Sequence, residues 1–69
     1  MPREHDIVRL TQPRPDHGLP AGAAGTVVYV FHAPRLAFEV EFCDAEGRTI
    51  AQLPLLPHEI EPVDIRQPV

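Results

Sequence analysis

Cysteine is almost absent from this sequence, because Cys43 is the only one among 69 residues. An intramolecular disulfide is therefore excluded, and a lone thiol is typical of a reducing compartment, so we expect a cytoplasmic protein. The first residues lack the apolar run of a secretory signal, and no apolar stretch approaches the ~20 residues that span a bilayer. We therefore expect no association with a membrane.

Size is also limited, and it restricts how much surface the chain can bury. A domain this small buries roughly 60% of the surface that its unfolded chain exposes. Without a disulfide, its stability must come from apolar packing or from association with a partner or a second copy. Hydrophobic residues make up 43% of the chain, enough for one compact core. We expect one domain over residues 1–63 and a flexible C-terminal tail over residues 64–69.

Positive charge is scarce, and lysine is missing altogether. Six arginines stand against ten acidic residues, for a formal net charge of −4. Proteins that bind phosphate backbones cluster their positive charge, whereas these arginines are spread singly along the chain. The sequence thus argues against nucleic acid as the partner. That partner would require Arg9, Arg14, Arg35 and Arg48 to converge in space.

Helical periodicity is absent, and short runs with strand composition take its place. We predict strands at residues 5–10, 26–32, 37–43, 48–53 and 60–63, with Pro54 ending the fourth and a single 3₁₀ turn at 57–59. Residues 13–25 hold three prolines and three glycines, which predicts a long loop between the first two strands. This pattern predicts an all-β fold, a small five-stranded barrel or sandwich.

The glycines of that loop, Gly18, Gly22 and Gly25, invite comparison with a phosphate-binding loop. Such a loop needs a helix after the glycines, so that helix N–H groups meet the phosphate. Here the run Thr26-Val27-Val28 predicts a strand instead. We interpret the glycines as a turn that leads the chain into the second strand.

Residue types that could support catalysis or metal binding are present but are not arranged for it. His5, His17, His32 and His58 show no metal-ligand spacing, so we expect neither a metal nor another cofactor. Cys43 has only His32 as a candidate partner, and we interpret it as a structural thiol. Glu39 and Glu41 alternate with apolar residues, as on a solvated strand face. With Asp44 and Glu46 they form an acidic patch suited to an arginine-rich partner.

The second predicted strand is apolar on both faces. Val28 and Val30 point to one side, while Val27, Tyr29 and Phe31 point to the other. In one interpretation a bend, a bulge or the long loop covers the second face. In the other, Tyr29 and Phe31 form an exposed aromatic patch that docks a partner or a second copy.

Several segments together resemble a known family. They are Asp6-Ile7-Val8-Arg9-Leu10, the glycine loop ending in Gly25-Thr26-Val27-Val28, and Phe38-Glu39-Val40-Glu41-Phe42. In this order they resemble the bacterial family called domain of unknown function 4926, from about residue 5 to 63. The resemblance implies an SH3-like barrel and brings no established activity. Looser likenesses to the SH3-like part of the nitrile hydratase β subunit and to KOW-type modules of translation are analogies of fold.

The function that we predict is a non-catalytic SH3-like module that binds another protein, as an accessory subunit or an antitoxin-like partner. The alternative is a KOW-like module associated with nucleic acid or the ribosome. An enzymatic function would need a site that the sequence does not display. The residues expected to contact the partner are His17, Leu19, Tyr29, Phe31 and Arg35.

Overall fold

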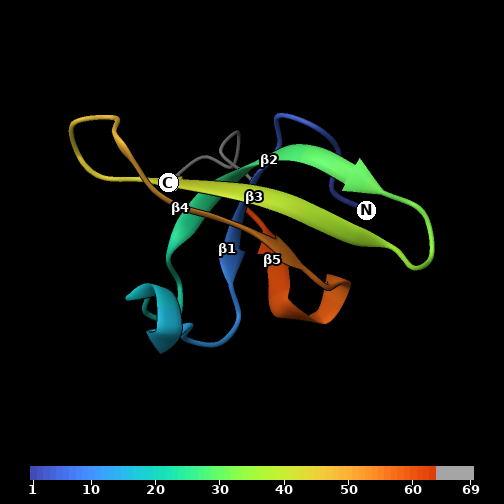
Figure 1. The fold of residues 1–69 in the computed structure, drawn as a ribbon, viewed down its shortest axis with the longest axis horizontal. Coiled ribbons are helices and arrows are strands. Elements are labelled where there is room, and N and C mark those ends of the chain that lie inside the picture. The colour runs from blue at the N-terminus through green and yellow to red at the C-terminus, as the bar shows by residue number, and fades with distance from the viewer. Residues whose placement is uncertain (64–69) are drawn as a thin grey trace.

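Five antiparallel strands form one sheet in the computed structural model, which describes residues 1–63 (Figure 1). The strand order is β4-β3-β2-β1-β5. The elements are β1 (Ile7–Leu10), η1 (Pro15–His17), β2 (Ala24–Phe31), β3 (Ala37–Cys43), β4 (Thr49–Leu55), η2 (Pro57–Glu59) and β5 (Ile60–Pro62), where η1 and η2 are 3₁₀ turns. The predicted all-β class is confirmed. The predicted tail, residues 64–69, lies outside the described residues.

The sheet curls around one hydrophobic core. Leu53 and Leu55 come from β4, and Ile60 comes from β5, although these two strands lie at opposite edges of the sheet. All three side chains nevertheless belong to the same buried cluster, which also contains Val8 and Leu10 of β1. A flat sheet could not bring its two edges to one core, so the strands must bend toward each other on the apolar side.

Strand β3 lies at the centre of that core and has the predicted alternation. Phe38, Val40 and Phe42 are almost fully buried, whereas Glu39 and Glu41 are only partly buried and lie on the opposite face. Because successive side chains of a strand point to opposite sides, this pattern fixes which face of the sheet is inside. We call the other face, which carries the two glutamates, the outer face.

Strand β2 contains a bulge that explains its apolar character on both faces. The register shifts between Val27 and Tyr29, so that Val28 is the extra residue. Val27 pairs with the buried Val40 on the inner side, while Tyr29 pairs with Glu39 on the outer side. One extra residue reverses the alternation beyond it. The bulge thus turns valines inward on both of its sides and directs the two aromatic residues outward.

The connection from β1 to β2, residues 11–23, is held by its own backbone hydrogen bonds. Arg14 and Leu19 exchange N–H···O bonds of 2.7 and 3.0 Å, and the Gly22 N–H donates to the Leu10 carbonyl at 2.8 Å. Gly18 and Gly22 adopt φ values of 68° and 84°, which favour glycine. The predicted loop over residues 13–25 was wrong at its C-terminal end, because β2 begins before Gly25.

Gly25 instead lies within β2, where its backbone packs closely against β3. A Cβ atom there would fall 2.7 Å from Val40 Cγ1, 2.8 Å from the Glu41 carbonyl oxygen and 2.9 Å from Phe42 Cδ1. Contacts this short are not tolerated between heavy atoms of this kind. The residue is therefore required to be glycine by packing against β3.

The sequence predicted that Pro54 ends the fourth strand. This prediction was wrong, because β4 continues to Leu55. Proline lacks a backbone N–H donor. A central strand is paired on both sides and needs these donors, whereas an edge strand is paired on one side only. Strand β4 is at the edge of the sheet and pairs only with β3, where Pro54 lies opposite Glu39. The predicted 3₁₀ turn at 57–59 is confirmed. Residues 1–63 contain no helix with the length and apolar character needed to cross a bilayer.

Candidate functional site

The residues predicted to contact a partner do not lie together. Tyr29 and Phe31 occupy the outer face of β2, and the exposed Arg35 lies in the turn that follows. His17 is exposed on η1, near the start of β2, so about 20 Å of strand separates it from the aromatic residues. Figure 1 shows this separation between η1 and the β2–β3 hairpin end. Leu19 is 4% exposed and belongs to the core, where it stabilises the fold and offers no contact surface.

The two aromatic side chains form a pair in contact with solvent. Tyr29 is 52% exposed and Phe31 is 37% exposed. Their ring centroids are 4.8 Å apart with an interplanar angle of 68°, an edge-to-face arrangement. Such pairs are favourable by about 0.5–1.5 kcal/mol beyond the area that they bury, so each ring helps to fix the other. Both proposals for the second strand thus hold in part: it has a bulge, and its aromatic face is exposed.

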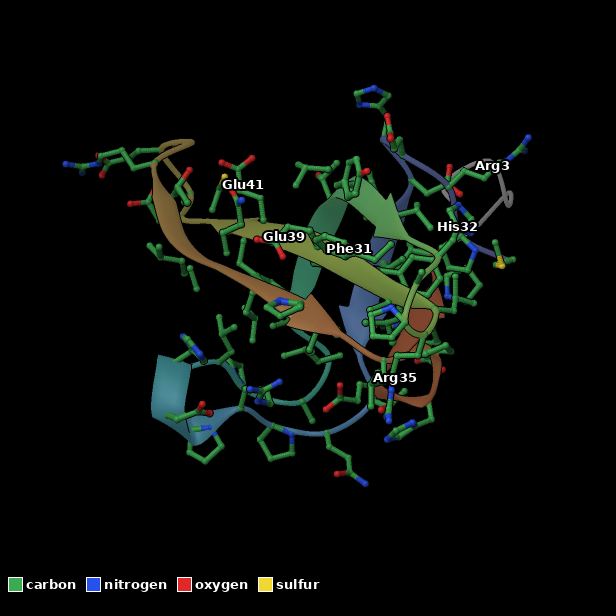
Figure 2. The ribbon with its side chains drawn as sticks, turned by 45° about the vertical axis from the view of Figure 1, so that its right-hand side comes forward. Arg3, Phe31, His32, Arg35, Glu39 and Glu41 are labelled. Atoms are coloured by element: carbon green, nitrogen blue, oxygen red, sulfur yellow. The ribbon has the colours of Figure 1, made fainter. Side chains whose placement is uncertain are left out.

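Two carboxylates of β3 share the outer face of the sheet with the aromatic pair. Glu39 is directly opposite Tyr29 in the β2–β3 register, and it accepts a hydrogen bond of 3.1 Å from Gln52 Nε2. Glu41 accepts a hydrogen bond from the hydroxyl of Thr49. Figure 2 shows Phe31, Glu39 and Glu41 along the two strands, with Arg35 toward the hairpin end. We call Tyr29, Phe31, Glu39 and Glu41 the aromatic–acidic surface.

Five of the seven other acidic side chains in residues 1–63 differ from these two by lying in ion pairs with arginine, and Glu4 and Asp6 are the exceptions. The ion pairs are Arg9–Glu61, Arg14–Asp16, Arg14–Glu59, Arg48–Asp44 and Arg48–Glu46. Among residues 1–63, Glu39 and Glu41 form no ion pair and are bonded to neutral donors. The predicted acidic patch is therefore reduced, because Arg48 partly neutralises Asp44 and Glu46. What remains is a pair of uncompensated carboxylates on β3.

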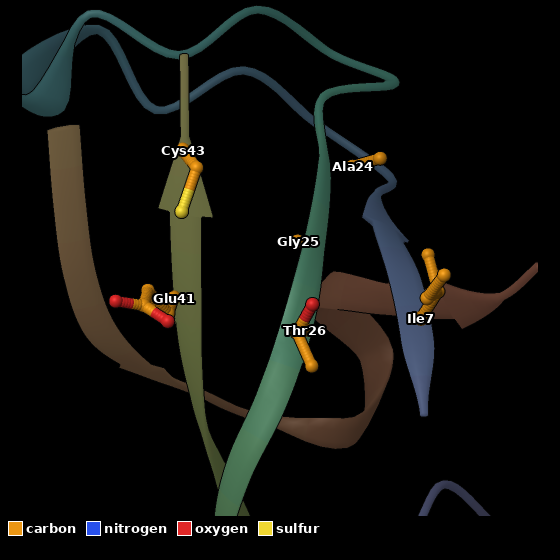
Figure 3. Close-up of a pocket in the computed structure, with 6 residues that line it drawn as sticks. All are labelled: Ile7, Ala24, Gly25, Thr26, Glu41 and Cys43. Carbon is orange, nitrogen blue, oxygen red and sulfur yellow. The ribbon is translucent and has the colours of Figure 1, made fainter. Parts of the chain in front are cut away.

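A shallow hollow, which the sequence analysis did not identify, adjoins this surface. It has a volume of about 220 Å³ and is open to solvent. Its lining residues, labelled in Figure 3, are Ile7, Ala24, Gly25, Thr26, Glu41 and Cys43. The outward side chains of β2 are small here, Ala24 and Thr26, and the longer side chains of Ile7 on β1 and Glu41 on β3 flank Thr26. The small residues at the start of β2 were the sequence signal for this hollow. Whether their side chains face outward, however, depends on the register of β2 with β1.

The remaining candidate residues are the polar side chains around η1, the possible metal ligands and Cys43. The hydrogen bond from Arg14 lowers the pKa of Asp16, an exposed residue of η1, below its ordinary value of 3.8, and His17 lies against the same carboxylate. Within the described part of the chain, no group of three or more His, Cys, Asp or Glu side chains could hold a metal ion. The exposed thiol of Cys43 is free.

Comparison with known proteins yields a family but no described relative. No curated protein and no solved structure matches the chain. The segments that carried the sequence resemblance lie in β1, β2 and β3, and all fall within the matched region. The model of the family described as "Domain of unknown function (DUF4926)" matches residues 4–62, and the protein therefore belongs to this family.

Proposed function

We propose that this protein is a non-catalytic, SH3-like module that binds another protein through its aromatic–acidic surface. The observation that carries the proposal is the exposed edge-to-face pair of Tyr29 and Phe31. Aromatic residues are enriched in the buried centres of protein interfaces, where they bring a large contact area with few rotatable bonds. A pair that is already fixed in the free protein loses little further entropy on binding.

The SH3-like part of the proposal is supported by the path of the chain. Five short antiparallel strands curl so that β4 and β5, the edge strands, share one core, and a 3₁₀ turn precedes the last strand. Residues 11–23 would correspond to a long Pro/Gly loop between the first two strands. The resemblance to an SH3-like family implies this arrangement, but function is argued from the surface and not from the fold.

The non-catalytic part is supported by the positions of the candidate nucleophile and base. Cys43 lies at the end of β3, and His32 follows β2 at the opposite end of the same hairpin. The length of β3 separates them by about 20 Å, whereas a nucleophile and its base must be within hydrogen-bond reach. The glutamates of β3 face open solvent beside neutral donors, which suits recognition better than proton transfer.

A nucleic-acid module is less well supported. Of the four arginines that such a module would bring together, Arg9, Arg14 and Arg48 each lie against a carboxylate. Contacts to phosphates would require these side chains to exchange an acidic neighbour for another anion. We therefore base the proposal on protein binding. A salt titration with single-stranded RNA that shows no binding at low ionic strength would agree with this choice.

The proposal is tested by replacing both aromatic residues. The double variant Tyr29→Thr with Phe31→Thr keeps β-branched residues in the strand, so we expect it to fold. Affinity capture from the native cell, followed by quantitative mass spectrometry, should show at least about a tenfold loss of the specific partner, because hot-spot residues dominate binding. Ile50→Thr is the matched control, since Ile50 is 56% exposed on β4 outside the aromatic pair.

A folded double variant that captures the same proteins as the wild type would contradict the proposal. Thermal unfolding followed by circular dichroism establishes folding for both variants. Light scattering after size-exclusion chromatography measures whether either substitution changes the association state. Retention of the partner by the double variant, but not by Ile50→Thr, would move the binding surface to β4.

A further inference from the structure

We infer that the partner presents an arginine to the aromatic–acidic surface, with an apolar side chain two residues away that enters the neighbouring hollow. The inference rests on the proposed function, because it assigns a chemistry to the same partner. It is carried by the juxtaposition of two uncompensated carboxylates, an exposed aromatic pair and an open hollow on one face of the sheet. None of these features alone specifies a cation.

The carboxylates supply the charge. Glu39 and Glu41 project from the same side of β3, and two residues of strand separate them by about 7 Å. Their present hydrogen-bond donors, Gln52 and Thr49, are neutral. Each carboxylate has lone pairs for more than one donor, so a guanidinium can bind without displacing either neighbour. The formal net charge of −4 adds a long-range attraction for a cationic partner.

The aromatic pair makes arginine the preferred cation. Tyr29 lies directly opposite Glu39, so a cation bound by that carboxylate is beside the ring. A planar guanidinium can stack on an aromatic face while its N–H groups donate to a carboxylate. An ammonium is a compact, strongly hydrated charge that cannot do both over the same area. The surface therefore distinguishes arginine from lysine.

The hollow sets the spacing of the partner's side chains. It lies in the row formed by Ile7, Thr26 and Glu41, which are neighbours in the strand register. The row of Tyr29 and Glu39 comes next along β3, about 7 Å away. Side chains on the same side of an extended segment repeat over the same distance. An apolar side chain in the hollow thus places an arginine two positions away against Glu39.

A second copy of the chain fits this surface less well than a different protein. Three of the arginines in residues 1–63 are already bound to carboxylates of their own chain. Two acidic proteins also repel each other at low ionic strength. Arg3 and Arg35 form no ion pair among the described residues, so of the arginines in residues 1–63 these two are the ones free to mediate self-association.

The experiment uses blocked peptides of defined sequence and the ¹⁵N-labelled full chain. The probes are Gly-Ser-Leu-Ser-Arg-Ser-Gly and its reverse, Gly-Ser-Arg-Ser-Leu-Ser-Gly, because an extended segment can run in either direction along β3. Amide shifts should appear at Thr26, Tyr29, Glu39 and Glu41 for at least one of them. Replacing arginine by neutral citrulline should weaken binding about tenfold, and lysine should bind several-fold more weakly than arginine.

Two double variants with the same change in net charge locate the cation. Glu39→Gln with Glu41→Gln should weaken binding of the arginine peptide about tenfold. Glu46→Gln with Glu61→Gln removes two carboxylates that lie against Arg48 and Arg9, so it should reduce binding less than twofold. Replacing the leucine of the peptide by serine should also weaken binding and remove the shift at Thr26.

Three results would overturn the inference. They are equal binding of the arginine and citrulline peptides, equal losses in the two double variants, or the same shifts appearing on concentration of the protein without peptide, which would identify a second copy as the occupant. If the peptides fail while the Tyr29 and Phe31 substitutions still abolish capture of a partner, the protein-binding function stands and the arginine assignment is wrong. If both experiments fail, the proposed function fails as well.

Discussion

The connection between β1 and β2 and the aromatic–acidic surface use their residues in opposite ways. The connection, rich in proline and glycine, satisfies its own backbone through the Arg14–Leu19 and Gly22–Leu10 hydrogen bonds and buries Leu19 in the core. The surface lies on two strands that pair on both sides of the bulge at Val28, and it leaves Tyr29 and Phe31 exposed. The proline- and glycine-rich segment is structural, whereas the strand with apolar residues on both faces carries the candidate site.

The difference shows what each kind of signal reports. Proline and glycine report constraints on the backbone, and those constraints are met here within a few residues of the chain. Whether an aromatic side chain is exposed depends on how the strands pair, because the pairing decides which face the sheet turns inward. Substitutions in the two regions should therefore separate stability from binding.

The largest effect is expected at Gly25, where the connection has just led into β2. A valine there would place Cβ within 3 Å of the Glu41 carbonyl and of two buried side chains. We expect Gly25→Val to lower the free energy of unfolding by about 4 kcal/mol or more, because a backbone atom cannot move aside. Urea denaturation measures this loss. Ala24→Val, whose side chain faces outward, should change stability by less than about 1 kcal/mol.

A smaller loss of stability is expected for substitutions that compare the two regions directly. Leu19→Ala should lower the free energy of unfolding by about 2–4 kcal/mol, because it removes buried methyl groups and leaves a cavity. Tyr29→Thr with Phe31→Thr should cost less, about 1–2 kcal/mol in total, because it removes one pair of partly exposed rings, leaves no cavity and keeps residues that favour strands. Thermal and urea unfolding measure both. Equal losses would show that the aromatic pair is structural, and Leu19→Met, a volume-conserving control, should remain near wild type.

The smallest effect concerns pH and is confined to the connection. The hydrogen bond from Arg14 holds the pKa of Asp16 below 3.8, so ionised Asp16 stabilises the folded chain above that value. This stabilisation is lost as the pH falls through the lower folded pKa. In an NMR titration of the carboxyl group, Arg14→Gln should raise the pKa of Asp16 toward 3.8. His17→Gln should raise it less, because His17 is the weakest of the contributing groups.

Much of the fold could be predicted from residue patterns alone. Period-two alternation identified the buried side of β3, because Phe38, Val40 and Phe42 could not be exposed together without a large cost in hydration. The turn at 57–59 was also confirmed, since proline fixes the backbone of its first residue. Predictions failed where pairing decides the outcome: Pro54 is accepted in β4 only because that strand is an edge.

The candidate site was less accessible to prediction. The sequence identified Tyr29 and Phe31 but left open whether a bulge or a loop would cover them. It also grouped them with His17 and Leu19, which the structure places at a distance and in the core. The hollow beside Glu41 was missed, because it is formed by outward positions on three neighbouring strands.

The sequence by itself determined the all-β class, the inward face of β3 and the family resemblance, because strand propensity and alternation act over a few neighbouring residues. Only the tertiary structure decided that the bulge at Val28 turns Tyr29 and Phe31 to solvent. It also decided that Glu39 and Glu41 have neutral neighbours, whereas carboxylates such as Asp44 and Glu61 lie against arginines. Those outcomes depend on which residues of distant strands lie opposite one another. Register is a non-local property, fixed when the apolar faces of all five strands close on one core.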